Sequence, residues 1–173
     1  IELNPRIPEG YKSLALILRF KGDFDGASAA LLKGLEADPK NTPILINLCV
    51  EAYCKADIAG AERFARRAIE VDPQEAFAMS WIGTICAMTG RFEEAMSFAQ
   101  RILRTSDTPF YVSVAYMLRL YVEAKRGDTR AIPVAAKEAM AAGARSYHCD
   151  AFLALAAAME GRREDARRIL DEV

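Results

Sequence analysis

The residues best suited to catalysis or metal binding are few and scattered. The single histidine, His148, stands beside Cys149 and Asp150, which superficially resembles a nucleophile with its base. Adjacent residues on a helix point about 100° apart, so these three side chains would not face one another. The cysteines form no Cys-x-x-Cys pair, and one histidine cannot complete a zinc site with them. The sequence therefore predicts no metal site and no nucleophilic centre.

Each cysteine lies in an apolar helical context, where a free cysteine acts as a small hydrophobic residue. Free thiols favour a reducing compartment, and we therefore expect a cytoplasmic protein. The four residues are Cys49, Cys54, Cys86 and Cys149.

Paired acids occur at Glu93-Glu94 and Glu164-Asp165. Both pairs are expected to begin helices, where carboxylates favour the positive end of the helix dipole. No glycine-rich phosphate loop is present, and with one histidine most catalytic arrangements are excluded. We therefore predict that the chain is not an enzyme and carries no cofactor.

The overall composition is that of a protein with a packed core. Of its 173 residues, 52% are apolar and 27% are charged, with 23 basic against 24 acidic residues. Such a balanced chain carries no field that would gather phosphates, so nucleic acid is not an expected partner. No apolar run approaches the roughly 18–20 residues that span a bilayer, so no membrane insertion is expected.

An internal repeat of 34 residues sets the architecture. Pro5, Pro39 and Pro73 are spaced by 34 residues, and each ends a segment of the form apolar-Glu-x-(Asn or Asp)-Pro. Chance does not keep several residue types at one spacing over this length. The same step relates Ala27, Ala61 and Ala95, relates Gly22, Ala56 and Gly90, and separates Gly127 from Gly161.

Each repeat is predicted to be a helical hairpin. In the first, Leu14 and Leu18 recur at helical spacing, and Gly22-Asp23 ends one helix and caps the next. Ala27 lies where the two helices would approach closely. Asp38-Pro39 ends the second helix, because proline disfavours helix at the residue before it.

The turn sequence Gly-Arg-Phe-Glu-Glu-Ala at 90–95, with a small residue in the preceding helix and a terminal proline, resembles the tetratricopeptide repeat. The resemblance covers nearly the whole chain and implies an all-α fold, a right-handed superhelical solenoid of stacked antiparallel helix pairs. It implies one solenoid domain with the end of a truncated repeat at 1–7 and repeats at 8–41, 42–75, 76–109, 110–146 (irregular) and 147–173 (partial).

The fourth repeat departs from the pattern. Gly90 and Gly127 are 37 residues apart, so about three extra residues are expected near 104–112. We predict an unusually long first helix, about 110–126, and a changed angle between successive hairpins. Pentatricopeptide repeats, which bind RNA, have a similar length, but the near-neutral charge and the Asp-Pro endings argue against them.

In the resembled family the first helix of each hairpin lines a concave groove in which partners usually bind. Here those helices carry more aromatic and aliphatic groups than solvation would select, which usually marks an interaction site. The alternative is that Trp81 and Phe77 are buried by a neighbouring hairpin. The candidate groove residues are Lys12, Leu16, Phe20, Ile46, Asn47, Val50, Tyr53, Phe77, Trp81, Met88 and Tyr121, with Ser80, Met117, Leu118, His148, Phe152 and Leu155 as further members of the strip.

One subgroup of the family grips the carboxylate of chaperone tails with lysines, asparagines and an arginine. This sequence keeps Lys12 and Asn47 but has Leu16, Phe77 and Trp81 at other clamp positions. Without most of the cations, paired charge-assisted hydrogen bonds to an anion are lost. We therefore predict that chaperone tails are not bound.

The sequence thus favours a protein-interaction scaffold that holds a peptide or partner helix in an apolar groove, or that associates with itself. The alternative is a regulatory or oligomerisation tail of a larger protein, for example a bacterial cyclase, kinase or transcription regulator. That alternative is prompted by residues 1–5, which match the end of a repeat.

Overall fold

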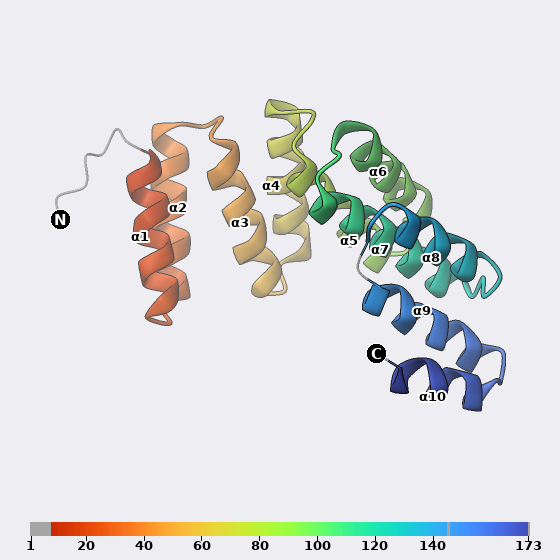
Figure 1. Ribbon diagram of the computed structural model, residues 1–173. Coiled ribbons are helices and arrows are strands. Elements are labelled where there is room, and N and C mark those ends of the chain that lie inside the picture. The colour runs from red at the N-terminus through yellow and green to blue at the C-terminus, as the bar shows by residue number, and fades with distance from the viewer. Residues whose placement is uncertain (1–7, 145, 173) are drawn as a thin grey trace. The chain divides into compact units, whose positions relative to one another are not determined.

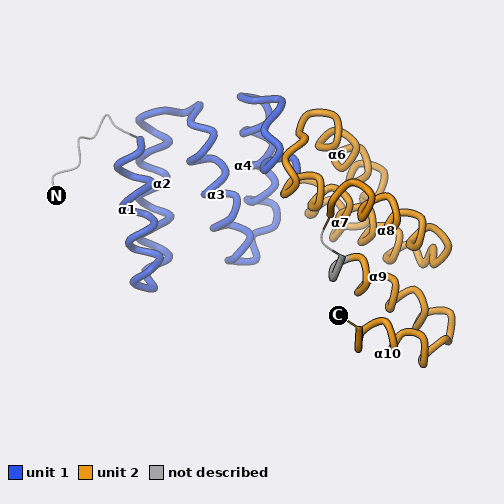
Figure 2. Tube along the Cα trace, viewed as in Figure 1, with its two compact units in different colours: residues 1–81 blue, residues 82–173 orange. Residues whose placement is uncertain are grey.

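The described residues form ten α-helices that pack as consecutive pairs (Figure 1). The computed structural model describes residues 8–144 and 146–172, with side chains for all of these except 146–148. The chain divides into two compact units, residues 1–81 and residues 82–173 (Figure 2). The predicted all-α class and the helix pairs are confirmed. The predicted remnant of an earlier repeat at 1–7 lies outside the described residues.

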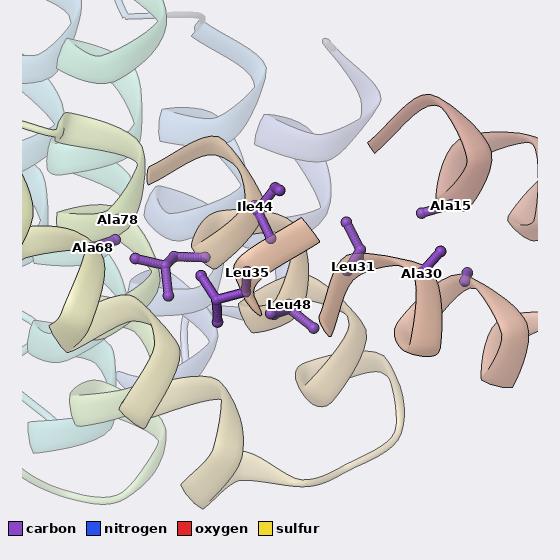
Figure 3. Packing of buried hydrophobic residues seen from close by; sticks show 10 residues of the cluster. Ala15, Ala30, Leu31, Leu35, Ile44, Leu48, Ala68 and Ala78 are labelled. Carbon is purple, nitrogen blue, oxygen red and sulfur yellow. The ribbon is translucent and has the colours of Figure 1, made fainter. Parts of the chain in front are cut away.

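Unit 1 holds two complete helix pairs and the start of a third. Its core is built from side chains such as Leu31, Ile44 and Leu48, each at most 3% exposed (Figure 3). Burying one such side chain stabilises the fold by about 1.5–3 kcal/mol. Ala15 and Ala27 fill the close contact between the first two helices. The helices are α1 (Pro8–Phe20), α2 (Phe24–Ala37), α3 (Thr42–Cys54), α4 (Ile58–Val71) and the part of α5 (Ala76–Met88) up to Trp81.

Unit 2 continues from the second half of α5. Its longest helix packs against three others, since α7 contacts α6, α8 and α9. Gly83 of α5 allows a close approach here, because a Cβ at this position would lie 2.3 Å from Cδ2 of Leu118. The other helices of this unit are α6 (Phe92–Thr105), α7 (Pro109–Arg126), α8 (Ala131–Ala141), α9 (Ser146–Met159) and α10 (Arg163–Asp171).

The turn between the two helices of each hairpin has one geometry. In the second hairpin the N–H of Asp57 donates to the carbonyl of Ala52, and the N–H of Ala56 donates to Tyr53. This is the Schellman motif, which needs a left-handed residue at the turn. Ala56 has φ 60°, although alanine is disfavoured there. The turn residues of the five hairpins are Gly22, Ala56, Gly90, Gly127 and Gly161.

The extra residues of the fourth repeat lie within a helix. α7 has 18 residues against 13 in α3 and α5, and it begins at Pro109, one residue before the predicted start. The segment that joins α6 to α7 is no longer than the other joining segments. The ends of α6 and α8 and the start of α7 border a shallow depression of about 690 Å³, lined among others by Asp107 and Tyr116.

Ion pairs at one register link consecutive hairpins inside each unit. Nζ of Lys55, one residue before its turn residue, lies 2.7 Å from Oδ1 of Asp25, three residues after the preceding turn residue. Arg126 and Glu93 form the same pair in unit 2. The pair lowers the pKa of Asp25, through a hydrogen bond from Lys55 and its charge.

At these two positions the last two hairpins carry charges opposite in sign to those of the pairs Lys55–Asp25 and Arg126–Glu93. Glu160 stands one residue before Gly161, and Arg130 stands three residues after Gly127. Hydrogen bonds from Arg162 and Thr129, together with the charges of Arg162 and Arg130, lower the pKa of Glu160. In the second and third hairpins the equivalent residues, Ala59 and Thr89, are uncharged.

Candidate partner-binding site

Three first helices supply the predicted groove residues of unit 1. Arg19 of α1 bonds to Glu51 of α3, and Tyr53 of α3 contacts Trp81 of α5, so α1, α3 and the start of α5 are neighbours. We call their predicted residues the unit 1 face. It consists of Lys12, Leu16, Phe20, Ile46, Asn47, Val50, Tyr53, Phe77 and Trp81.

α1 gives the most exposed apolar groups of the unit 1 face. Leu16 is 50% exposed and Phe20 is 84% exposed. Both lie on one side of the helix, four residues apart, which brings their side chains together. Residues of the unit 1 face on α3 and α5, by contrast, are half-buried. Accessible apolar area is therefore concentrated on α1.

Aromatic side chains of α3 and α5 pack edge to face. The ring centroids of Tyr53 and Trp81 are 4.9 Å apart with an angle of 60° between planes, and those of Phe77 and Trp81 are 6.2 Å apart at 85°. Such pairs are worth about 0.5–1.5 kcal/mol beyond the area they bury. These three rings therefore stabilise unit 1 and also leave part of their surface accessible.

The indole N–H of Trp81 is buried, and no acceptor for it lies among the described residues. An unsatisfied buried donor costs about 1–3 kcal/mol.

Trp81 is also the only tryptophan of the chain, so its fluorescence reports on this place alone.

The polar residues of the unit 1 face are poorly placed to hold an anion together. Nδ2 of Asn47 donates to the backbone carbonyl of Pro43 at 2.8 Å, so the amide is engaged within its own helix. Lys12 forms no ion pair within the part of the chain that the structure describes. Leu16 and Phe77 offer no donor.

A buried ion pair that sequence reasoning did not predict lies beside this face. Nε of Arg19 donates to Oε1 of Glu51 at 2.7 Å, and the Glu51 side chain is only 5% exposed. The sequence marks only one of the two partners, an acid at a position that is apolar in later hairpins. Glu51 stands five residues before its turn residue, where the third and fourth hairpins have Ile85 and Val122.

The predicted residues of unit 2 are fewer and differ in kind. Met88 is 47% exposed, and Tyr121 is half-buried with Nζ of Lys125 5.5 Å from its ring centroid. The prediction that Leu118 of unit 2 and Ser80 of unit 1 line the groove is wrong. Leu118 is buried against Gly83, and Ser80 is buried with its hydroxyl donating to the carbonyl of Phe77.

Other members of the predicted strip in unit 2 have mixed exposure. Leu155 is exposed, while Met117 and Phe152 are half-buried. The side chain of His148 lies outside the described residues.

The acidic pairs lie where the sequence placed them, in the first turns of α6 and α10. Three of the four carboxylates form ion pairs: Glu93 with Arg126, Glu94 with Arg91 and Asp165 with Arg162. Burial raises the pKa of Cys49 to about 12, so its thiol stays protonated at neutral pH. Within the described residues no cluster of histidine, cysteine and acidic side chains could hold a metal ion.

Comparison with known proteins identifies the class of the fold. Residues 9–41 match the family model described as Tetratricopeptide repeat. These residues, which cover α1 from its second residue and all of α2, are therefore similar in sequence to a tetratricopeptide repeat. No curated protein matches the chain significantly.

Solved structures extend the likeness over almost the whole chain. MamA protein is 24% identical, with a TM-score of 0.74, covering 95% of this chain and 88% of that one. A tetratricopeptide repeat protein from Parabacteroides merdae is 18% identical, with a TM-score of 0.86, covering 98% of this chain and 65% of that one. The chain therefore has the fold of tetratricopeptide-repeat proteins.

A third similar structure holds a peptide. It is the first tetratricopeptide domain of Spaghetti (RPAP3), bound to the HSP90 peptide SRMEEVD. It is 22% identical, with a TM-score of 0.62, covering 73% of this chain and 98% of that one.

No helix within the described residues has the length and apolar character needed to cross a membrane.

Proposed function

We propose that the chain is a protein-interaction scaffold whose unit 1 face binds an apolar peptide or the apolar side of a partner helix. Tetratricopeptide-repeat proteins generally mediate protein–protein interactions, and residues 9–41 are similar in sequence to this repeat. The observation that carries the proposal is the exposure of Leu16 and Phe20 on a first helix whose neighbours present aromatic rings.

The partner chemistry follows from the side chains present. An amphipathic helix places apolar residues three and four positions apart, which matches the spacing of Leu16 and Phe20 along α1. Tyr53 and Trp81 provide rigid rings of the kind that often anchor partners at the centre of an interface. Lys12 adds one cation at the edge of the face.

A chaperone-type acidic tail does not fit this proposal. Asn47 is bonded within its helix, and Leu16 and Phe77 cannot donate to a carboxylate. An anion would therefore meet one cation rather than a set of converging donors, and a single exposed charge contributes little.

The proposal also assigns no catalytic activity to the chain. The acidic pairs that could act as acid and base are explained by their places in the first turns of helices and by their ion pairs.

The test selects binding peptides and maps them onto the face. Peptides would be selected by display against the chain and titrated while the emission of Trp81 is recorded. We expect the selected peptides to be apolar on one side. We expect Leu16→Asp and Phe20→Asp each to weaken their binding by about tenfold or more, since each buries a charge in the interface.

Leu32→Asp is the matched control for Leu16→Asp, because Leu32 is exposed to a similar extent as Leu16 but lies on the second helix α2. The peptide SRMEEVD is expected to bind far more weakly than the selected peptides. Equal binding by the Leu16 and Phe20 variants, or tight binding of SRMEEVD, would contradict the proposal.

A further inference from the structure

The buried ion pair of unit 1 occupies a place that apolar residues fill in later hairpins. Five residues before its turn residue the second hairpin has Glu51, whereas the later hairpins have apolar residues that are at most 2% exposed, namely Ile85, Val122 and Ala156. Replacing a buried ion pair by apolar residues often costs little or stabilises the fold. Stacking of the hairpins therefore does not require the pair of Arg19 and Glu51.

The pair holds the guanidinium of Arg19 in one orientation. Nε of Arg19 donates to Oε1 of Glu51 at 2.7 Å, and Nη2 of Arg19 lies 2.5 Å from the same oxygen. The guanidinium is planar, so two N–H groups directed at one buried oxygen fix the direction of the others. An arginine that is already held in this way loses little further side-chain entropy when it binds a partner.

The remaining N–H groups of Arg19 are open to a partner. The Arg19 side chain is 31% exposed, and Nη1 is neither buried nor hydrogen-bonded within the described residues. Arg19 follows Leu16 by three positions, so both lie on the same side of α1. The bond to Glu51 directs Arg19 toward α3, the helix that carries Val50 and Tyr53. The unit 1 face therefore has a fixed hydrogen-bond donor among its apolar groups.

The charge of the pair determines which acceptor fits this donor. Arg19 and Glu51 have opposite charges, so together they carry no net charge. A carboxylate that approached Arg19 would also approach the carboxylate of Glu51, which repels it. A backbone carbonyl accepts the same hydrogen bond without that repulsion and with a smaller desolvation cost. An uncharged acceptor therefore fits this place better than an anion.

A partner helix has free carbonyl groups only in its last turn. The carbonyls of that turn lack intrahelical donors, and the helix dipole places partial negative charge on them, which a guanidinium favours. A helix whose apolar side covers Leu16 and Phe20 can therefore offer carbonyls to Arg19 only if its C-terminal end lies there.

We infer that Arg19 is a specificity-determining residue of the unit 1 face and binds the free carbonyl groups in the last turn of a partner helix. Glu51 is a positioning residue, because it acts on the partner through Arg19. The inference rests on the proposed function, since it requires a partner on the unit 1 face. It adds a direction, because the C-terminal end of the partner helix lies at Arg19.

The experiment uses a helical peptide selected by display against the full chain and synthesised with either an amide or a carboxylate at its C-terminus. Binding is followed by the emission of Trp81. The double variant Arg19→Leu/Glu51→Leu removes the donor without leaving a buried charge unpaired. It should bind the amide form about tenfold more weakly than the wild-type chain does, because hydrogen bonds from a charged donor are lost. Lys33→Leu removes an exposed cation from α2 and is the matched control that should leave binding unchanged.

The single variant Glu51→Leu separates recognition from stability. It keeps the donor of Arg19 but removes the charge that repels an anion. The ratio of the affinity for the carboxylate form to the affinity for the amide form should therefore rise by about tenfold relative to the wild-type chain. A pair that acts on folding alone would leave this ratio unchanged. Circular dichroism checks that each variant retains its helicity.

Lengthened peptides test the direction of the partner helix. One further helical turn of alanines at the C-terminus supplies intrahelical donors to the carbonyls that Arg19 binds, so the affinity should fall by about tenfold. The same turn added at the N-terminus is the control and should leave the affinity unchanged.

The outcomes distinguish this inference from the proposed function. If Leu16→Asp and Phe20→Asp weaken binding and Arg19→Leu/Glu51→Leu does not, the unit 1 face binds a partner without Arg19, and the inference is wrong. It is also wrong if the affinity ratio stays constant in Glu51→Leu or if both extensions weaken binding equally. If Leu16→Asp and Phe20→Asp leave binding unchanged, the proposed function fails, and this inference fails with it.

Discussion

The second helices of unit 1 and two second helices of unit 2, α6 and α10, are stabilised at their starts by different chemistry. The remaining second helix of unit 2, α8, follows Asp128, whose carboxylate accepts a hydrogen bond from the N–H of Ala131 at 3.0 Å. In unit 1, α2 and α4 each begin after an aspartate that caps the helix. The carboxylates of Asp23 and Asp57 accept hydrogen bonds from the backbone N–H groups of Gly26 and Gly60, both at 2.8 Å. Each bond satisfies a donor that the first turn leaves without an intrahelical partner.

In unit 2 the equivalent residue before α6 and before α10 is an arginine. Neither Arg91 nor Arg162 makes a side-chain capping bond. Each pairs instead with an acid three residues later, Arg91 with Glu94 at 3.3 Å and Arg162 with Asp165 at 2.9 Å. These acids also lie near the positive end of the helix dipole.

The comparison shows that the residue type at the helix start depends on the residue type three positions later. A Cβ at Gly60 would lie 2.0 Å from Oδ2 of Asp57, so the capping carboxylate fills the space that a side chain would need. Where arginine replaces the aspartate, that space is free and an acid takes the glycine's place. In these four helices the residue at the helix start and the residue three positions later therefore vary together, whereas before α8 Asp128 is followed three positions later by Ala131.

The largest expected difference between the units is in thiol reactivity. Cys54 of unit 1 is exposed, whereas Cys86 and Cys149 of unit 2 are buried. Thiolate formation and access both limit reaction, and burial raises the pKa of Cys149. Cys54 should react with a disulfide reagent about 1,000-fold faster than the unit 2 thiols, which need local opening. Mass spectrometry of the labelled peptides measures this, and Cys54→Ser is the control that should remove the fast phase.

The second difference is the ion pair between hairpins of unit 1. Arg19→Ala leaves Glu51 buried without a partner and should lower the free energy of unfolding by about 2–4 kcal/mol. Glu51→Leu should be far milder, because apolar residues serve at this position in unit 2 and buried pairs are often replaced at little cost. Urea unfolding followed by circular dichroism measures both. Equal losses for the two variants would show that the pair itself, rather than the buried charge, is what matters.

Substitutions at the turn residues should change the stability less, and with opposite signs in the second and third hairpins. Ala56→Gly should raise the stability of the chain by about 0.5–1 kcal/mol, since alanine is strained at positive φ. Gly90→Ala, at the same position of the third hairpin, should lower it by about 1 kcal/mol. No atom outside the neighbouring residues would meet a Cβ at Gly90, so any loss there is backbone strain. Thermal unfolding of both variants gives the comparison, and a shift of the same sign for both would refute it.

The helix starts give the smallest effects. Asp57→Ala should cost about 1 kcal/mol, whereas Arg91→Ala should cost only about 0.3 kcal/mol because its pair is partly exposed. Gly60→Ala should be more favourable in the Asp57→Ala background than in the wild-type chain, with a coupling of about 1 kcal/mol. Additive effects across this cycle would mean that Asp57 and Gly60 are independent.

Local signals explain why most of the fold could be predicted from the sequence. Glycine at the turns, aspartate after them and proline after the second helices each act within a few residues, and the 34-residue step repeats them. The long α7 followed from the spacing of Gly90 and Gly127, and only its first residue differs from the prediction. The repeat boundaries and the single solenoid domain remain predictions.

Features that join different hairpins could not be predicted in this way. The bond from Arg19 to Glu51 crosses 32 residues of sequence, and its geometry depends on how two hairpins stack. A regular repeat predicts that Leu118 faces the groove, whereas in α7 this residue packs against Gly83. The choice of groove residues is accordingly a prediction that binding measurements must test.

The ion pairs between hairpins have a consequence for how such a gene can change. Suppose that a hairpin with a basic residue after its first helix, such as Lys55, is duplicated. The basic residue can form an ion pair when the copy follows a hairpin with an acidic residue at the start of its second helix, such as Asp25. The last hairpin has Glu160 at this place and is matched by Arg130 instead. Duplication or exchange of hairpins is therefore directional, because the sign of one side chain restricts which neighbour each hairpin can follow without repulsion.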